Sequence, residues 1–126
     1  MNCLLDTCAM FALATGTLPR RAYKSLEKSP QVFVHMTSLW ELAIKHASGK
    51  LSLSHPPLEW YERLLAHHGL SELPIARPAL ALAPTLPPIH KDPFDRLIIA
   101  TAILHQLVII TCDEKISQYP RIKTLW

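Results

Sequence analysis

The apolar positions of this chain fall into short uninterrupted runs that alternate with longer segments of helical periodicity. The runs are rich in aliphatic and β-branched residues. The run LVIIT at residues 107–111 is almost entirely apolar, which is typical of a strand buried on both faces of a parallel sheet. Pro74 weakens the prediction for the run around it. The predicted strands are residues 2–5, 31–35, 70–75, 107–111 and 122–125.

The ends of the periodic segments carry residues that start or stop helices. Gly16, Gly49 and Gly69 each follow such a segment and predict its end. Thr37 or Ser38 can cap the helix after the second strand. Asp92 and Pro93 fit the cap and the first position of the helix with the strongest pattern. The predicted helices are residues 7–14, 20–28, 39–48, 58–68, 78–83 and 93–105.

Strands that alternate with helices predict an α/β fold, in which a short, mainly parallel sheet has helices on both faces. A length of 126 residues, of which 49% are apolar, suits a single domain spanning residues 1–126. No apolar run approaches the roughly 20 residues that span a bilayer. The N-terminal segment lacks a basic region before its apolar stretch, so we expect no secretory signal and a cytoplasmic protein.

Charge and cysteine content add two weaker expectations. The formal net charge is +3, which permits a polyanionic partner without requiring one. Four basic residues cluster in one predicted helix, where they form either a solvated face or a set of phosphate contacts: Arg20, Arg21, Lys24 and Lys28. Three cysteines without a CxxC pair do not suggest a disulfide framework. We expect Cys8 and Cys112 to be small buried packing residues, with a reactive thiol pair as the lesser alternative.

The most informative feature is the placement of four carboxylates along the chain. Asp6 and Asp113 directly follow two predicted strands, and Glu41 and Asp95 lie in the first turns of two predicted helices. Ligands of parallel sheets gather beyond the carboxyl ends of the strands, where the following helices also begin. The sequence therefore predicts that these four acids converge on one pocket.

Carboxylates that converge repel one another unless a cation balances them. Mg²⁺ and Mn²⁺ prefer oxygen ligands, and such an ion can activate water and shield a phosphodiester under attack. Such a pocket therefore predicts metal-dependent hydrolysis of a phosphodiester bond, for which we expect RNA as the substrate. The sequence has no HExxH pair, no glycine-rich phosphate loop and no GxSxG segment, which argues against those other chemistries.

Each acid also has a purely structural interpretation when it is taken alone. Asp6 can cap the helix that follows it, and Glu41 stands four residues before Lys45, as in an exposed helix ion pair. Asp95 is favoured near a helix start by the helix dipole, and Asp113 can be an ordinary loop acid. His90 can contact substrate or belong to a solvated loop. It is the joint placement of the acids that favours a catalytic site.

Three segments resemble the PIN-domain proteins, in the order and at the spacing of that family. LLDTCAMFALATG resembles their opening segment, and SLWELAIKHASGKLSL resembles the helix with their second acid. HKDPFDRLIIATAILHQLVIITCDEKISQYP resembles the C-terminal block of VapC-type toxins, in the subgroup with the DPFDR signature. These segments cover well over half of the chain. Many relatives carry His at the position of Cys8, a departure that leaves all four acids in place.

The resemblance implies a three-layer α/β/α sandwich and an endoribonuclease that uses Mg²⁺ or Mn²⁺. It assigns catalysis and metal binding to Asp6, Glu41, Asp95 and Asp113, and an auxiliary role to Asp92. Thr7 and Thr111 match small hydroxyl residues near the metal. It also implies a toxin that pairs with a small antitoxin and often forms a homodimer. Apolar residues that could serve those contacts, with core packing as the simpler account, are Met10, Phe11, Trp40 and Trp60.

Residues beside the acids are candidates for substrate contact: His90, Lys91 and Arg96. Two alternatives to the ribonuclease toxin remain open from sequence. One is another phosphoesterase with an acidic Mg²⁺ pocket, such as a DNA nuclease or a phosphatase. The other is a binding module without catalysis, whose acids hold a structural ion or a basic partner. The sequence does not identify the RNA target.

Overall fold

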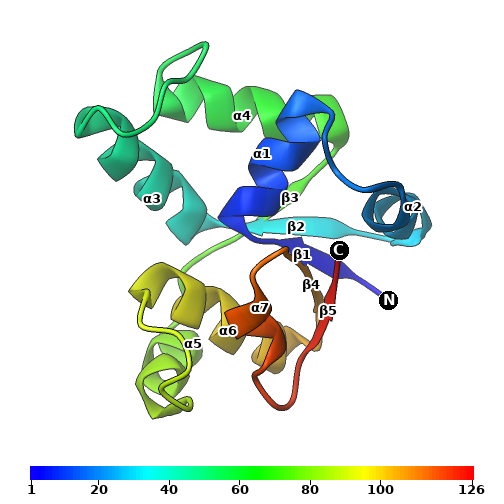
Figure 1. Cartoon of the computed structure of the whole chain (residues 1–126), viewed down its shortest axis with the longest axis vertical. Coiled ribbons are helices and arrows are strands. Elements are labelled where there is room, and N and C mark those ends of the chain that lie inside the picture. The colour runs from blue at the N-terminus through cyan, green and yellow to red at the C-terminus, as the bar shows by residue number, and fades with distance from the viewer.

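The computed structural model describes residues 1–126, and its centre is a five-stranded sheet in which every pair of neighbours is parallel (Figure 1). The strand order is β3-β2-β1-β4-β5, so β1 lies in the middle. The predicted parallel sheet is confirmed, although each strand is only three or four residues long. The strands are β1 (Cys3–Leu5), β2 (Val32–His35), β3 (Ser71–Leu73), β4 (Val108–Ile110) and β5 (Lys123–Leu125).

Helices connect the strands, and their ends agree with the sequence signals within a few residues. Gly16 and Gly69 adopt positive φ angles of 71° and 63° directly after two helices, as predicted. The helices are α1 (Thr7–Thr15), α2 (Arg20–Lys28), α3 (Met36–Ala47), α4 (Pro57–His68), α5 (Arg77–Leu82), α6 (Pro93–His105) and α7 (Glu114–Ser117), with a 3₁₀ turn η1 (Ala83–Thr85) after α5. None of them is both long and apolar enough to cross a membrane.

Alternate residues of each central strand point to opposite faces of the sheet, and each face has its own apolar core. Leu5 packs with α1, α2, α3 and α4 on one face, whereas Leu4 packs with α5, α6 and α7 on the other. The two groups of helices lie on either side of the sheet in Figure 1. The expected three-layer α/β/α sandwich is therefore confirmed. Each fully buried aliphatic side chain stabilises this arrangement by about 1.5–3 kcal/mol.

The start of α3 differs from the prediction. The strand β2 continues into α3 without a loop, so His35 occupies the cap position that was predicted for Thr37 or Ser38. His35 Nδ1 accepts a hydrogen bond from Thr37 N–H at 3.1 Å. Its Nε2 is buried without a partner, and burial lowers the pKa of His35 to about 4. One consequence is that Glu41 lies in the second turn of α3 and not in the first.

The helix α7 was not predicted, because only four residues form it. Asp113 caps it directly after β4 and Thr111, as Asp6 caps α1 directly after β1. The carboxyl ends of β1, β2 and β4 and the starts of α1, α3 and α7 thus lie at one edge of the sheet. This edge carries the candidate site.

Candidate active site

Asp6 sits at the end of the central strand and is almost completely buried, with 2% of its surface exposed. Its backbone N–H donates to Ile110 O at the end of β4, and its Oδ1 accepts from Ala9 N–H at 2.8 Å. Burial raises the pKa of Asp6 to about 6 against the opposing hydrogen bonds from Thr111 and Ala9, and the charges of Asp113 and Glu41 raise it further. Asp6 therefore caps α1, as the sequence allowed, and the cap uses only its Oδ1 atom.

Asp113 uses its two carboxylate oxygens in different directions. Oδ1 accepts from Lys115 N–H at 2.9 Å and so caps α7, while Oδ2 lies 2.8 Å from Nε2 of His90. Thr111 Oγ1 accepts from the Asp113 backbone N–H at 3.0 Å and fixes the turn between strand and helix. Burial alone would raise the pKa of Asp113, but the hydrogen bonds from His90 and Lys115 lower it below its usual value.

Asp95 lies in the first turn of α6, with its Oδ2 atom 3.1 Å from the same His90 nitrogen. Burial raises the pKa of Asp95 to about 7, and the negative charges of Asp92, Glu41 and Asp6 act in the same direction. The surroundings of Asp95 thus disfavour its ionised form. A cation placed beside Asp95 would favour its ionised form and lower its pKa.

Glu41 projects from α3 and is held by two donors. Its Oε1 accepts from the Thr7 hydroxyl at 2.7 Å, and its Oε2 lies 2.8 Å from Lys45 Nζ. The Thr7 oxygen also lies 3.0 Å from Ser38 Oγ. The helix ion pair that sequence suggested as a structural alternative is present, yet Glu41 is 95% buried and its charge acts on Asp6 and Asp95. The ion pair and a place in the acidic pocket thus coexist.

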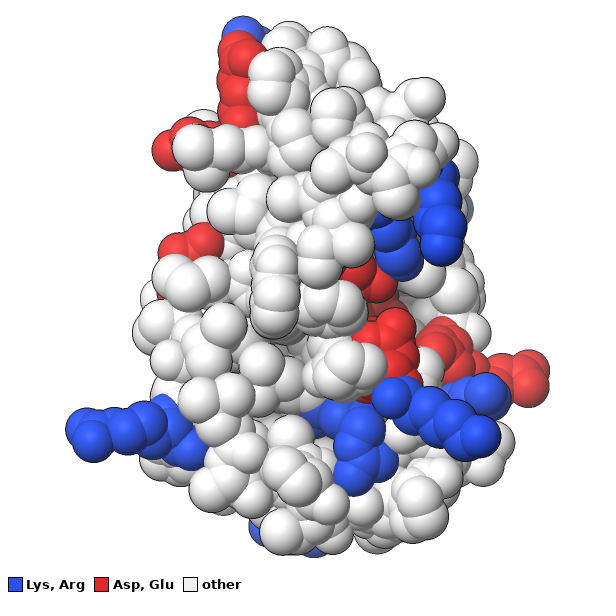
Figure 2. Space-filling model, turned by 90° about the vertical axis from the view of Figure 1, so that its left-hand side faces the viewer, with Lys and Arg blue, Asp and Glu red and all other residues white.

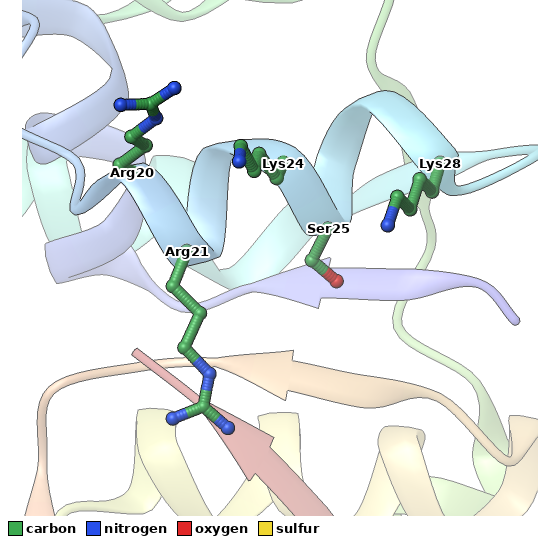
Figure 3. Close-up of a pocket in the computed structure, with 5 residues that line it drawn as sticks. All are labelled: Arg20, Arg21, Lys24, Ser25 and Lys28. Atoms are coloured by element: carbon green, nitrogen blue, oxygen red, sulfur yellow. The ribbon is translucent and has the colours of Figure 1, made fainter.

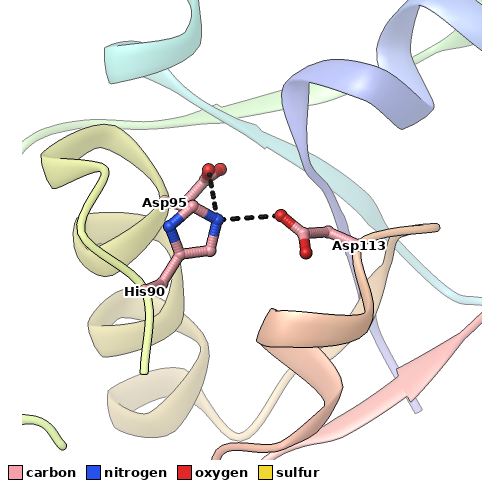
Figure 4. Close-up of side chains that lie close together, drawn as sticks. All are labelled: His90, Asp95 and Asp113. Carbon is pink, nitrogen blue, oxygen red and sulfur yellow. Dashed lines mark hydrogen bonds and ion pairs between the residues drawn. The ribbon is translucent and has the colours of Figure 1, made fainter. Parts of the chain in front are cut away.

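The structure therefore brings the four carboxylates from distant parts of the sequence to one edge of the sheet, where each acts electrostatically on others. One Asp95 oxygen, one Asp113 oxygen and one His90 nitrogen lie within 4.8 Å of one another (Figure 4). In the space-filling view, acidic side chains gather in a hollow with basic side chains on both sides (Figure 2). Of the four acids, Asp95 and Asp113 thus meet at His90, and Asp6 and Asp113 follow neighbouring strands of the sheet.

His90 links the acids as a hydrogen-bond donor. Its Nδ1 accepts from Asp92 N–H at 3.1 Å, so in the neutral ring the proton is on Nε2. That N–H lies between Asp95 and Asp113, as Figure 4 shows. A neutral histidine in this tautomer has no free lone pair on Nε2 for a metal. The His90 N–H therefore contacts the same Asp95 and Asp113 oxygen atoms that a cation would need as ligands.

The donor set of this site fits a hard divalent cation. The carboxylates supply oxygen ligands, and no cysteine or paired histidine favours zinc. Two of the acids, Asp6 and Asp95, have pKa values raised by burial and by neighbouring negative charge. A bound cation would remove the cost of ionising them. Asp6, Asp95 and Asp113 are the residues that would hold it, with Glu41 beside them.

With this geometry in place, comparison with known proteins identifies the family. The sequence matches the PIN domain family over residues 3–122, which is nearly the whole chain. This chain belongs to the PIN domain family. It is 33% identical over 114 residues to Ribonuclease VapC22 of Mycobacterium tuberculosis, a match that covers 86% of this chain and 85% of that protein.

Solved structures support the same fold. This PIN domain resembles a chain of VapBC2 from Rickettsia felis bound to a promoter DNA fragment, with a TM-score of 0.73, 18% identity, and coverage of 99% of this chain and 98% of that one. It also resembles a chain of DNA-bound VapBC from Salmonella typhimurium, with a TM-score of 0.69, 17% identity, and coverage of 99% and 97%. At this level of identity the likeness establishes the fold alone.

The residues predicted to contact substrate take different positions in this PIN domain. Lys91 is exposed and lines a hollow together with Glu41, Lys45 and Asp92. Asp92 caps α6, because its Oδ1 accepts from Phe94 N–H at 2.8 Å. His90 contacts the acids themselves. Only Lys91 therefore presents a free charge at the rim of the pocket.

Arg96 departs from the expectation of substrate contact. Its guanidinium donates to four backbone carbonyl groups of residues 83–90, at distances of 2.8 to 3.1 Å. Its Nη1 also lies 3.4 Å from the Tyr119 hydroxyl, which accepts from His90 N–H at 2.7 Å. We therefore assign Arg96 to holding the loop that carries His90.

The sequence did not identify Tyr119 as a neighbour of His90, and the predicted burial of two cysteines was wrong. Nothing in the local sequence marks Tyr119, which is buried and reaches His90 across 29 residues. The expectation that Cys8 and Cys112 are buried was wrong: both are exposed, and Cys3 is the buried cysteine. The protein around Cys8 still removes part of its hydration. This loss of hydration, followed by the negative charge of Asp6, raises the pKa of Cys8 to about 11, so its thiol stays protonated.

Proposed function

We propose that this chain is an endoribonuclease that requires Mg²⁺ or Mn²⁺ and acts as the toxin of a toxin–antitoxin pair. The proposal is supported by the position of Asp6 and Asp113 at the ends of neighbouring strands of a PIN domain and by the negative charges of Glu41 and Asp6 acting on Asp95. The similarity to a protein named as a ribonuclease, over most of both chains, supports RNA as the substrate. An RNA substrate would place this activity in the cytoplasm.

The residues of the site would have distinct tasks. Asp6, Asp95 and Asp113 would hold the cation, and Glu41 would stay fixed between Thr7 and Lys45. When bound, the cation would neutralise charge on the phosphodiester and make water more acidic. Burial raises the pKa values of Asp6 and Asp95 to about 6 and about 7 in the metal-free protein, and a bound cation would favour the ionised form of both. No side-chain nucleophile is needed, and the protonated Cys8 thiol is unsuited to that role.

A metal-dependent cleavage assay tests this proposal. The unmodified chain is incubated with Mg²⁺ or Mn²⁺ and, separately, with single-stranded RNA, structured RNA, DNA and a phosphomonoester. We expect cleavage of RNA alone, loss of cleavage when the metal is chelated, and loss in Asp95→Asn. Cleavage of DNA or of the phosphomonoester instead would support the other phosphoesterases. The absence of any hydrolysis, with full biological effect in Asp95→Asn, would support a binding module.

We also propose a small antitoxin as partner and a homodimer as the assembly. Solved structures with this fold include chains of toxin–antitoxin complexes, one of them from Klebsiella pneumoniae, with a TM-score of 0.62, 21% identity, and coverage of 98% of this chain and 96% of that one. Met10 is buried in the core, and Phe11 packs on Trp60 with ring centroids 5.1 Å apart. Trp40 is 60% exposed and is the apolar side chain best placed for a partner. Light scattering of the chain, alone and expressed with the product of the neighbouring reading frame, measures both assemblies.

A further inference from the structure

The helix α2 carries an unusual concentration of positive charge on its solvent side. Arg20, Arg21, Lys24 and Lys28 supply four of the 13 Lys and Arg residues within nine positions, against the single acid Glu27. All four are exposed, and none takes part in an ion pair. They line a hollow of about 530 Å³ together with Ser25, and no apolar side chain contributes to it (Figure 3).

This arrangement is unfavourable for the helix itself. Arg20, Lys24 and Lys28 follow one another at intervals of four residues, and like charges at that spacing cost about 0.2–0.5 kcal/mol per pair. Arg20 and Arg21 also occupy the first turn, where the helix dipole favours acids. Local stability therefore does not account for the basic face, and an anionic ligand would offset the repulsion among its charges.

The basic face of α2, formed by Arg20, Arg21, Lys24 and Lys28, lies near the edge of the sheet that carries the candidate site. Ser25 and Ser29, toward the C-terminal end of α2, contact Cys3 at the beginning of β1, so this end of the helix lies at the start of that strand. Arg21 lines a second hollow of about 230 Å³ whose other lining residues include Thr111 and Asp113. Figure 3 shows the Arg21 side chain leaving α2 toward β5, away from the row formed by Arg20, Lys24 and Lys28.

We propose that the basic face of α2, with Arg21 as its link to Asp113, binds the sugar–phosphate backbone of the RNA on one side of the cleavage site. This inference rests on the proposed ribonuclease function and extends it to a substrate-binding surface. At a rise of 1.5 Å per residue, Arg20, Lys24 and Lys28 present charges about 6 Å apart along the helix. A row of this kind follows several nucleotides of a single strand without reading its sequence.

An acidic protein segment is the other polyanion that could bind here, and the lining of the hollow argues against it. Protein interfaces place apolar and aromatic side chains at their centres, and this hollow has none. A phosphate backbone needs only charge and hydrogen-bond donors. Arg21 and Asp113 also line the same hollow, which places the basic face beside a proposed catalytic residue and favours a substrate.

The test measures RNA affinity without turnover, in a chain inactivated by Asp95→Asn. A triple variant, Arg21→Gln with Lys24→Gln and Lys28→Gln, is compared with a matched triple, Lys50→Gln with Arg77→Gln and Lys123→Gln. The matched triple removes the same charge from exposed positions elsewhere. Fluorescence anisotropy with a labelled single-stranded RNA of about 16 nucleotides gives Kd at about 50 mM and 200 mM salt. A polyglutamate peptide of similar length is the second probe.

We expect the α2 triple to weaken RNA binding more than about tenfold at the lower salt and to reduce the salt slope by up to about 2, since each lost contact removes about 0.7. The matched triple should change Kd less than about twofold. Equal RNA binding by the two triples, or no RNA binding by the parent chain, would overturn the proposal. Loss of peptide binding alone would also overturn it and assign the face to an acidic partner. Because binding is read without cleavage, failure of the ribonuclease assay remains a separate result.

Discussion

His90 Nε2 and Asp113 Oδ2 lie 2.8 Å apart, and the same nitrogen lies 3.1 Å from Asp95. The backbone N–H of Asp92 orients the ring from its other nitrogen, so that His90 donates to the two acids. This contact joins carboxylates that would otherwise repel each other. It also places a proton where a cation would bind.

We therefore expect His90→Ala to have opposite effects on the metal-free and the metal-bound protein. Removing the donor leaves Asp95 and Asp113 facing each other, so the melting temperature without metal should fall. Removing the competitor should leave Mn²⁺ affinity unchanged or tighter. Thermal melts with and without Mn²⁺ measure both effects. A weaker affinity for Mn²⁺ would show instead that His90 is a ligand.

Asp6→Asn should stabilise the metal-free protein at neutral pH. The folded pKa of Asp6 is about 6 against a usual 3.8, so the folded state holds the proton more tightly and stability falls as pH rises through that window. Asparagine keeps a side-chain oxygen for Ala9 N–H but carries no charge. At 1.36 kcal/mol per pKa unit, a rise from 3.8 to about 6 corresponds to a gain of about 3 kcal/mol.

Urea denaturation at several pH values measures this effect in both proteins. His35 provides an opposing slope in both, since its lowered pKa of about 4 means that its contribution is lost as pH falls below about 6.5. The difference between the two proteins therefore isolates Asp6. A variant less stable than the parent at neutral pH, with no change in pH slope, would contradict a raised pKa for Asp6.

Thr7→Val should lower RNA cleavage while the fold is kept. Valine has nearly the same shape, but Glu41 Oε1 loses the hydroxyl donor now at 2.7 Å. Loss of a hydrogen bond that orients a ligand group typically costs about 10- to 100-fold in activity. Thr7→Ser should restore most of the rate, and the exposed Thr15→Val serves as a control. Full activity in Thr7→Val would mean that Glu41 needs no orientation by this residue.

Arg96→Lys should destabilise the chain by about 2–4 kcal/mol, because hydrogen bonds to charged groups contribute about 1.5–3 kcal/mol each and a lysine cannot reach four carbonyl groups. The loop that positions His90 should loosen with it. Arg63→Lys, which alters an exposed pair with Glu59, should change stability by less than about 1 kcal/mol. Chemical denaturation compares the two variants. Equal losses in the free energy of unfolding would mean that the four carbonyl contacts of Arg96 contribute no more than an exposed ion pair.

Asp92→Asn should act more mildly than Asp95→Asn. The cap on α6 needs only a side-chain oxygen for Phe94 N–H, which asparagine retains. Asp95 would instead lose the charge that a cation requires. We expect RNA cleavage within about tenfold of the parent for the first variant and none for the second. Comparable losses in both would place Asp92 among the residues that hold the cation.

Local chemistry is what made parts of this structure predictable. Asp92 and Pro93 determine the start of α6 through bonds within a few residues, and Gly16 ends α1 through its own backbone angle. The apolar runs determine the strands because each of their side chains faces a core. The joint placement of the acids followed from one topological rule, namely that parallel strands end at the same edge.

The remaining features depend on contacts that the local sequence does not contain. The partner of Thr7 is 34 residues away, and the carbonyl groups that bind Arg96 become a cluster only when η1 and its loop fold back on α6. His35 becomes a cap only because β2 runs into α3 without a loop. The carbonyl contacts of Arg96 were likewise not predicted, since an arginine beside acids suggests substrate binding when its fold partners are unknown.

The central claim is that these carboxylates form one cation site, and calorimetric titration with Mn²⁺ tests it most directly. The parent chain should bind Mn²⁺, and Asp6→Asn, Asp95→Asn and Asp113→Asn should each weaken binding more than about tenfold. Glu62→Gln, at an exposed position on α4, should bind as the parent does. Three variants that bind Mn²⁺ as tightly as the parent, or a parent that binds none, would contradict the account.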